Sequence, residues 1–173
     1  MRLQLALNVE DIDEAVDFYS TLFDVTPAKR KPGYANFAIE NPPLKLVLFE
    51  VKGASERLNH LGVEVFDAED VMLATQRLVD AGKAALVEDE STCCYAKQDK
   101  VWAIEPDGLR WEWYRVLEDS ETFGAAPTLD ADVDGDVTVD VTGDRDVTVA
   151  VEEKPDDGIQ EKVESTGRLE ACC

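Results

Sequence analysis

The sequence has no long hydrophobic run and is poor in basic residues. No stretch approaches the roughly 18 consecutive apolar residues that a membrane-spanning helix needs. Acidic residues already occur within Met1–Ala15, where a signal peptide would carry its apolar segment. With 17 Lys and Arg against 38 Asp and Glu, the formal net charge of −21 disfavours nucleic acids and anionic membranes as partners. We therefore expect a cytoplasmic protein without nucleic-acid or membrane partners.

Large apolar and aromatic residues are scarce in the last third of the chain. All three Trp, all four Tyr and the single His lie before residue 119, and Phe123 is the one aromatic residue after it. A segment rich in Asp, Glu, Thr and Gly cannot bury enough apolar surface to build a core. The composition predicts one domain over residues 1–118 and a disordered acidic tail over residues 119–173. Within that tail, Asp136–Val151 alternates with a period of two and could form a solvated hairpin.

The first 118 residues contain a repeat, with halves at about 1–52 and 57–118. Each half begins with an alternating strand, at Gln4 or at His60, followed by apolar residues at helical spacing. The second helix should stop at Gly82. Further strands are predicted at 35–39 and 44–49, and at 101–104 and 110–116. The pattern predicts an α+β fold in which the two halves close into one curved sheet with the helices outside.

Three polar residues occupy related positions in this repeat. Gln4 and His60 begin equivalent strands, and Glu112 aligns with Val47 in the last strands. An imidazole, a carboxylate and an amide oxygen would leave open positions on an octahedral metal, as substrate or dioxygen activation requires. The alternatives are ordinary. His60 could be satisfied by backbone groups, Glu112 could face solvent opposite its flanking tryptophans, and Gln4 is unremarkable in a strand.

The four cysteines occur as two adjacent pairs. Cys93 and Cys94 follow a polar segment that indicates a loop entering a strand, and two neighbouring thiolates can chelate a soft ion such as As(III) or Cd(II). Packing of small buried side chains is the alternative. Cys172 and Cys173, in the tail, could pre-bind As(III) or retain the inorganic product, or they could be an inert chain end.

The sequence resembles the arsenic–carbon lyase and cadmium-induced protein family, part of the vicinal oxygen chelate (glyoxalase/bleomycin resistance/extradiol dioxygenase) superfamily. The resemblance extends from about Leu3 to Gly124. The motifs that carry it are Gln4–Val9, Phe18–Tyr19, Leu22–Phe23, Pro27–Phe37, Pro42–Leu48, Leu58–Val65, Cys93–Trp102 and Asp119–Gly124.

The resemblance implies paired βαβββ modules forming a curved mixed sheet around a metal cleft. It also implies an Fe(II)-dependent dioxygenase that cleaves the C–As bond of methyl- or aryl-As(III) compounds to inorganic As(III), with dioxygen as co-substrate. The metal would lie at Gln4, His60 and Glu112, and the arsenic at Cys93 and Cys94. Mn(II) or Zn(II) would also suit these ligands. A homodimer is a further expectation from the superfamily.

Two other functions fit the same residues. One is a non-catalytic Cd(II)- or As(III)-binding resistance protein, which would use the thiols alone. The other is a different enzyme of the superfamily, such as an extradiol dioxygenase or a glyoxalase-like isomerase, which needs no neighbouring thiols.

Overall fold

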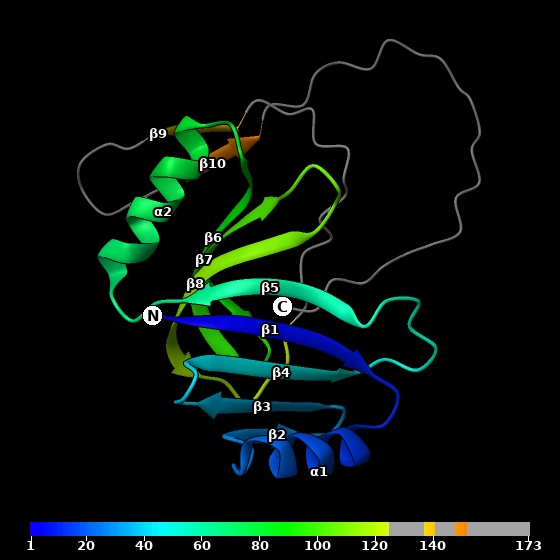
Figure 1. The fold of residues 1–173 in the computed structure, drawn as a ribbon. Helices are drawn as coiled ribbons and strands as arrows, with labels where there is room; N and C mark the ends of the chain where they lie inside the picture. The colour runs from blue at the N-terminus through cyan, green and yellow to red at the C-terminus, as the bar shows by residue number, and fades with distance from the viewer. Residues whose placement is uncertain (125–136, 141–147, 152–173) are drawn as a thin grey trace, which may run out of the picture.

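The computed structural model describes residues 1–124, 137–140 and 148–151. The first half of the domain comprises β1 (Arg2–Val9), α1 (Ile12–Phe23), β2 (Lys29–Lys31), β3 (Tyr34–Ile39) and β4 (Leu44–Glu50). The second half comprises β5 (Leu58–Glu64), α2 (Ala68–Asp80), β6 (Ala84–Cys93), β7 (Ala96–Ile104) and β8 (Arg110–Asp119). Figure 1 shows the strands forming one curved sheet. The predicted α+β fold with a curved mixed sheet is confirmed.

The sheet consists of two similar halves joined side by side. Its eight strands follow the order β2-β3-β4-β1-β5-β8-β7-β6, with β1 and β5 antiparallel at the join. In the first half β1 runs parallel to β4 with Ala6 opposite Val47, and in the second β5 runs parallel to β8 with Gly62 opposite Glu112. These equivalent registers confirm the alignment of Val47 with Glu112.

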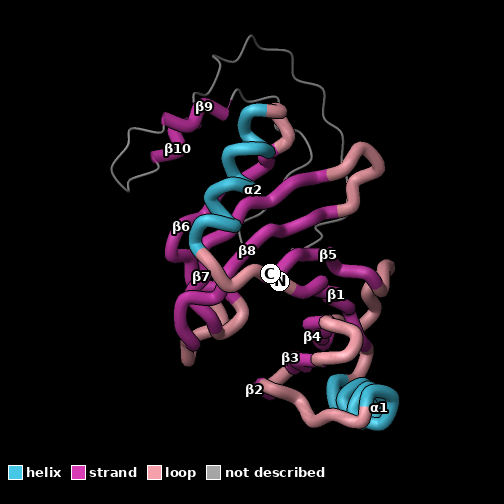
Figure 2. Tube along the Cα trace, turned by 60° about the vertical axis from the view of Figure 1, so that its left-hand side comes forward, coloured by secondary structure: helices cyan, strands magenta, loops and turns pink. Residues whose placement is uncertain are grey.

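Both helices cover the outer side of the sheet. Figure 2 shows α1 beside β3 and β4, and α2 beside β6, β7 and β8. Asp11 caps α1, because its carboxylate accepts hydrogen bonds from the backbone N–H groups of Asp13 and Glu14 at 2.8 and 2.9 Å. Helix α2 ends just before Gly82, whose φ of +61° suits the predicted helix stop.

The apolar core of the first half lies between α1 and the sheet. Ile12 and Val16 of α1 pack against fully buried Phe37, Leu46 and Leu48. Burying a side chain of this size contributes about 1.5–3 kcal/mol. Because side chains alternate along a strand, the residues between these core positions point to the opposite, concave side of the sheet. That side holds the polar residues described below.

Two segments differ from the sequence-based expectation. The basic run Lys29–Lys31, which lies outside the predicted strands, forms the short edge strand β2 paired with β3. Basic residues suit an edge strand, because their charge discourages further strand pairing. Strand β6 extends to Cys93, so the polar segment before the cysteines is also a strand, at the other edge of the sheet.

The period-two segment of the tail contains the antiparallel strands β9 (Val137–Asp140) and β10 (Thr148–Val151). The other tail residues beyond residue 124, including Cys172 and Cys173, lie outside the described residues, and the predictions made for them stay predictions. None of the described helices combines the length and apolar character needed to cross a membrane.

Candidate metal and thiol site

Gln4, His60 and Glu112 meet on the concave side of the sheet, although they come from β1, β5 and β8. Their exposed fractions are 3%, 0% and 3%, so all three are buried. The Nε2 atom of His60 lies 2.9 Å from Gln4 Nε2 and 3.2 Å from Glu112 Oε1. Gln4 Nε2 also donates a hydrogen bond to Glu112 Oε1. Three side chains far apart in the sequence therefore point at one place.

Hydrogen bonds fix the tautomer of His60. Its Nδ1 atom lies 2.7 Å from Asn59 Oδ1, and an amide oxygen can only accept. Asn59 is held in turn by a 2.8 Å hydrogen bond from its Nδ2 to Asn8 Oδ1. Nδ1 therefore carries a proton, and when the ring is neutral the lone pair of Nε2 faces Glu112. Metal-binding histidines are oriented by the same kind of second hydrogen bond.

Glu112 points into the protein and not into solvent. Its side chain lies opposite the flanking tryptophans, as strand alternation requires, but this face is the buried inner face of the curved sheet. Burial raises the pKa of this carboxyl, but a hydrogen bond and positive charge at His60, with the charge of Lys100, outweigh burial, and the net pKa lies below the ordinary value. A carboxylate is thus present at the centre of the site.

The donor set fits a metal cation. A lone pair of His60 and a carboxylate oxygen of Glu112 repel each other at 3.2 Å unless a proton or cation lies between them. Glu112 Oε2 is buried without a hydrogen-bond partner among the described residues. No group of three His, Cys, Asp or Glu side chains in the described part of the chain could hold a metal. Gln4, whose amide lies against both His60 and Glu112, is the neighbouring side chain that could supply a third donor.

Gln4 is held by Tyr114. In the structure the Tyr114 hydroxyl donates to Gln4 Oε1, and the amide nitrogen faces His60 and Glu112. For its oxygen to face a metal, the side-chain amide of Gln4 has to rotate so that its oxygen and nitrogen exchange places. The amide nitrogen can then donate a hydrogen bond to the hydroxyl oxygen of Tyr114. Burial and the charge of Glu112 raise the pKa of Tyr114, so its hydroxyl stays neutral and can serve in either orientation.

Gly62 makes room for Glu112. A Cβ atom at Gly62 would lie 2.8 Å from Glu112 Cγ and 3.3 Å from Oε1. We expect Gly62→Ala to displace the carboxylate, to lower metal affinity and to destabilise the fold by about 1–3 kcal/mol. Metal titration together with urea unfolding checks this. In Gly53→Ala the backbone is strained at φ +70° but nothing lies within 4 Å, so stability should fall while metal affinity stays unchanged.

The two cysteines lie at the tight turn between β6 and β7, and Cys94 lines a pocket beside it. Cys93 pairs with Ala96 across the β6–β7 hairpin, which leaves Cys94 and Tyr95 as its two central residues. Their φ angles are +51° and +63°. Two-residue hairpins of this kind favour Asn-Gly, so cysteine and tyrosine hold a conformation that is unusual for them. Backbone of this type concentrates at functional sites.

The turn is buried and fixed by its neighbours. The sulfur atoms of Cys93 and Cys94 lie 3.5 Å apart, and the residues are 2% and 5% exposed. Lys29 Nζ and Ser120 N donate to the Tyr95 carbonyl at 2.7 and 2.8 Å. The cysteines also belong to an apolar cluster with Ala6, Tyr34, Val47, Phe49, Tyr95 and Phe123. Val47, which takes the place of a fourth ligand in the repeat, therefore lies in the same cluster as the thiols.

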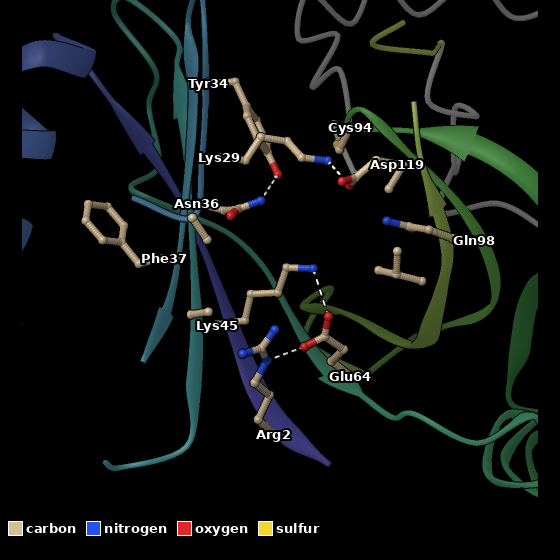
Figure 3. A pocket seen from close by; sticks show the side chains of 14 residues that line it. Arg2, Lys29, Tyr34, Asn36, Phe37, Lys45, Glu64, Cys94, Gln98 and Asp119 are labelled. Carbon is tan, nitrogen blue, oxygen red and sulfur yellow. Dashed lines mark hydrogen bonds and ion pairs between the residues drawn. The ribbon is translucent and has the colours of Figure 1, made fainter. Parts of the chain in front are cut away.

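A pocket of about 260 Å³ opens beside Cys94. Figure 3 shows Lys45, Glu64 and Arg2 at the end of this pocket away from Cys94. Tyr34 lines it and accepts a 2.8 Å hydrogen bond from Asn36 Nδ2. Burial and the charge of Cys94 raise the pKa of Tyr34, with a smaller effect from Glu112. Tyr34 therefore keeps a neutral hydroxyl, and its pKa depends on the charges of both Cys94 and Glu112.

A buried ion-pair cluster forms one end of the pocket. Glu64 contacts Arg2 and lies 3.0 Å from Lys45 Nζ, and it is only 4% exposed. Burial raises the pKa of Glu64, but the hydrogen bond from Arg2 and the charge of Lys45 outweigh it, and the net pKa is lowered. A lowered pKa means that the ionised carboxylate stabilises the fold above its unfolded-state pKa. This contribution is lost as the pH falls through the folded-state pKa.

We therefore expect Glu64→Gln to cost about 3 kcal/mol at neutral pH, since it leaves buried Lys45 and partly buried Arg2 without their anion. The difference in unfolding free energy between the variant and wild type should shrink as the pH falls below about 4.3, the ordinary pKa of a glutamate. Urea unfolding at several pH values measures it. Glu40→Gln, at an exposed position, is the matched control. A difference that stays constant with pH would contradict the assignment.

Several residues of this site were not indicated by the sequence alone. The repeat and the cysteine pair predict Gln4, His60, Glu112, Cys93 and Cys94. The structure brings the first three together, and it places the cysteines in an apolar cluster with Phe49, whose ring lies 6.5 Å from that of His60. It adds Asn59 behind the histidine, Tyr114 behind Gln4, Gly62 beneath the carboxylate, and Lys100 beside it. Period-two spacing from Glu112 to Tyr114 was the available signal for the tyrosine.

Comparisons with known proteins identify the family of the chain. The family model described as "Glyoxalase/Bleomycin resistance protein/Dioxygenase superfamily" matches residues 3–113. The cadmium-induced protein CadI of Mycobacterium tuberculosis (strain ATCC 25618 / H37Rv) is 55% identical over 138 residues, covering 80% of this chain and 91% of that protein. The trivalent organoarsenical cleaving enzyme of Thermomonospora curvata is 52% identical over 126 residues, covering 72% and 83%.

A solved structure shows the same fold. The Mn(II)-bound glyoxalase from Novosphingobium aromaticivorans superposes with a TM-score of 0.52 at 17% identity, covering 71% of this chain and 41% of that chain. At this identity the likeness concerns the fold alone. The resemblance drawn from the sequence motifs is confirmed by the family model and the relatives together. The chain belongs to the glyoxalase/bleomycin resistance protein/dioxygenase superfamily, in the family of the cadmium-induced proteins and trivalent organoarsenical cleaving enzymes.

Proposed function

We propose that the protein is an Fe(II)-dependent dioxygenase that cleaves the C–As bond of trivalent organoarsenicals, giving inorganic As(III) and organoarsenical resistance. The observation that carries the proposal is a buried histidine–carboxylate–amide triad on the concave side of the sheet, with two buried neighbouring cysteines in an adjoining apolar cluster. A relative named as a trivalent organoarsenical cleaving enzyme supports it. A cytoplasmic location and a homodimer stay predictions.

The triad would hold the metal. His60 offers the lone pair of Nε2, Glu112 offers Oε1, and Gln4 offers its amide oxygen after the rotation described above. An imidazole, a carboxylate and an amide suit Fe(II), with Mn(II) and Zn(II) as competitors. Val47 places an apolar side chain where the repeat would supply a fourth ligand, so coordination positions remain for exogenous ligands. Bound Fe(II) would supply the activation of dioxygen.

The thiols would hold the arsenic. Cys93 and Cys94 would each form an As–S bond and displace one hydroxide of the arsenical, which leaves as water with the thiol proton. With two bonds to neighbouring residues, the remaining As–C bond can point in only a narrow range of directions. Such positioning replaces a bimolecular encounter with one inside the protein. The rigid hairpin turn, pinned by Lys29 and Ser120, fixes where the arsenic lies.

The pocket beside Cys94 would take the carbon substituent. At about 260 Å³ it has room for more than a methyl group, and its lining is mostly polar. Tyr34, kept neutral, can donate its hydroxyl hydrogen to a group bound next to Cys94. Because Cys93, Cys94 and the triad are all nearly inaccessible to solvent, water is largely excluded around them.

Arsenic speciation tests the function. Reduced protein reconstituted with Fe(II) is incubated in air with methylarsonous acid or with a phenyl analogue, and the arsenic species are separated. We expect inorganic As(III) to accumulate beyond one equivalent of protein. Omission of Fe(II) or of dioxygen should each abolish it.

A binding function is the second candidate, and the thiol pair together with the relatives named cadmium-induced protein favours it. The same incubation separates the two. A stable protein-bound methylarsenical, without release of inorganic arsenic, would identify a protein that sequesters As(III) or Cd(II) on its thiols.

A further inference from the structure

Lys100 is a buried cation whose hydrogen-bonding capacity is not used. It is 1% exposed, and its Nζ atom has no hydrogen-bond partner among the described residues. Among the described residues it forms an ion pair with Glu112, whose Oε2 lies 3.8 Å away and is also without a hydrogen bond. Both atoms face each other at a distance too long for a hydrogen bond.

The position of Lys100 on the sheet places it in the site. It pairs with Tyr114 across β7 and β8, one alternation away from the pair Trp102–Glu112. Lys100, Trp102 and Glu112 therefore share the concave face with the triad. The Trp102 ring packs edge-on against the imidazole of His60, with 5.3 Å between ring centroids, and Lys100 Nζ lies 5.6 Å from the centroid of Trp102.

An unsatisfied buried ammonium is costly, and proteins usually satisfy such groups. The loss of hydration must be repaid by an anion and by hydrogen bonds. Glu112 supplies charge but no hydrogen bond, and that carboxylate would be shared with a metal. The three N–H donors of Lys100 therefore remain available to a small ligand bound beside Glu112.

We propose that Lys100 and the metal together form a binding site for a small oxygen- or nitrogen-centred anion at the open side of the metal. This inference rests on the metal site of the proposed function. A divalent cation, one carboxylate and one ammonium leave a net positive charge, because His60 and Gln4 are neutral. An anion is favoured in that field, and Lys100 adds a charge-assisted hydrogen bond to it. Lys100 is thus a ligand-binding residue beside the triad.

Azide binding to the Co(II)-loaded protein tests the proposal without any C–As cleavage. Co(II) affinity and azide affinity are both measured from visible absorption in the full-length protein. We expect Lys100→Met to weaken azide binding by about tenfold or more, the effect of losing one hydrogen bond to a charged group. Lys100→Arg should retain azide affinity within about threefold, because it keeps the positive charge and the donors.

Lys97→Met is the matched control. Lys97 lies on the same strand, but its side chain is on the opposite face and pairs with Glu90 at 2.9 Å. The same change of charge there should leave azide affinity unaltered. Lys100→Gln, which keeps donors but loses the charge, replaces Lys100→Met if the methionine variant does not fold, and it should also weaken azide binding.

The outcomes separate the two proposals. Equal azide affinity in wild type and in the Lys100 variants would overturn the inference and leave the metal site standing. A Lys100 variant that loses Co(II) affinity but keeps azide affinity would also overturn the inference, because Lys100 would then act only by stabilising the Glu112 carboxylate. A wild-type protein that binds no Co(II) would overturn the metal site and this inference with it.

Discussion

His60→Ala is expected to lose iron and C–As cleavage together. The imidazole is fully buried, its Nδ1 is held by Asn59, and its Nε2 faces Gln4 and Glu112. Removal of a metal ligand should lower Fe(II) affinity by more than about 100-fold, since loss of a supporting hydrogen bond alone costs about 10–100-fold. Iron content after reconstitution and arsenic turnover measure the two effects. No arsenic product should form above the metal-free background.

Two controls separate metal loss from unfolding. Circular dichroism and urea unfolding should show a folded variant, less stable because of the cavity left by the ring. Added imidazole can enter that cavity and should restore part of the metal binding. A His60→Ala protein with full iron occupancy would remove His60, and with it the proposed triad, from the mechanism.

Cys94→Ser should abolish tight binding of As(III) compounds while iron content stays near wild type. One remaining thiolate can form a single As–S bond, and loss of the second attachment typically costs about 10²–10⁴-fold in affinity. Cys93→Ser should behave in the same way, because the sulfur atoms lie 3.5 Å apart at one turn. Calorimetric titration of the reduced protein with methylarsonous acid gives the affinity, and metal analysis of the same samples gives the iron content.

The second pair of adjacent cysteines supplies control variants for Cys93→Ser and Cys94→Ser. Cys172→Ser and Cys173→Ser, alone or together, remove the other adjacent thiols, which lie outside the described residues. If the tail thiols are an inert end, these variants bind and turn over like wild type. Unchanged turnover in Cys94→Ser would remove the thiol-chelate mechanism. Retained activity on a catechol in a Cys93/Cys94 double variant would instead favour an extradiol dioxygenase.

The fold was largely predictable because both halves of the repeat show local patterns of apolar and polar residues. Alternating strands and helical spacing predicted both helices and most of the strands of the sheet, since each pattern depends on neighbours in sequence. The two edge strands were harder to predict. Strands β2 and β6 contain many charged residues, and a charged edge strand looks like a loop when its pairing partner is unknown.

The proposed ligands are easier to recognise in the sequence than the groups that contact and orient them. His60 is the only histidine, and the cysteines are adjacent, so these residues stand out in the sequence. Lys100, Tyr114 and Asn59 are ordinary residue types at ordinary positions. Their roles depend on which atoms they meet across the sheet, and that information resides in the strand register.

The case of Glu112 shows the division most clearly. Alternation alone establishes that its side chain lies opposite Trp111 and Trp113, but the same pattern describes a solvent-facing carboxylate and a buried one. Curvature of the sheet decides between them, because it turns one face inward and removes water from it. By itself the sequence determined the repeat, the family motifs and the thiol pair, all of which are local. Only the tertiary structure could place three strands in register, bury their polar ends together and bring Lys100 to the carboxylate, since those contacts join residues from different strands of the sheet.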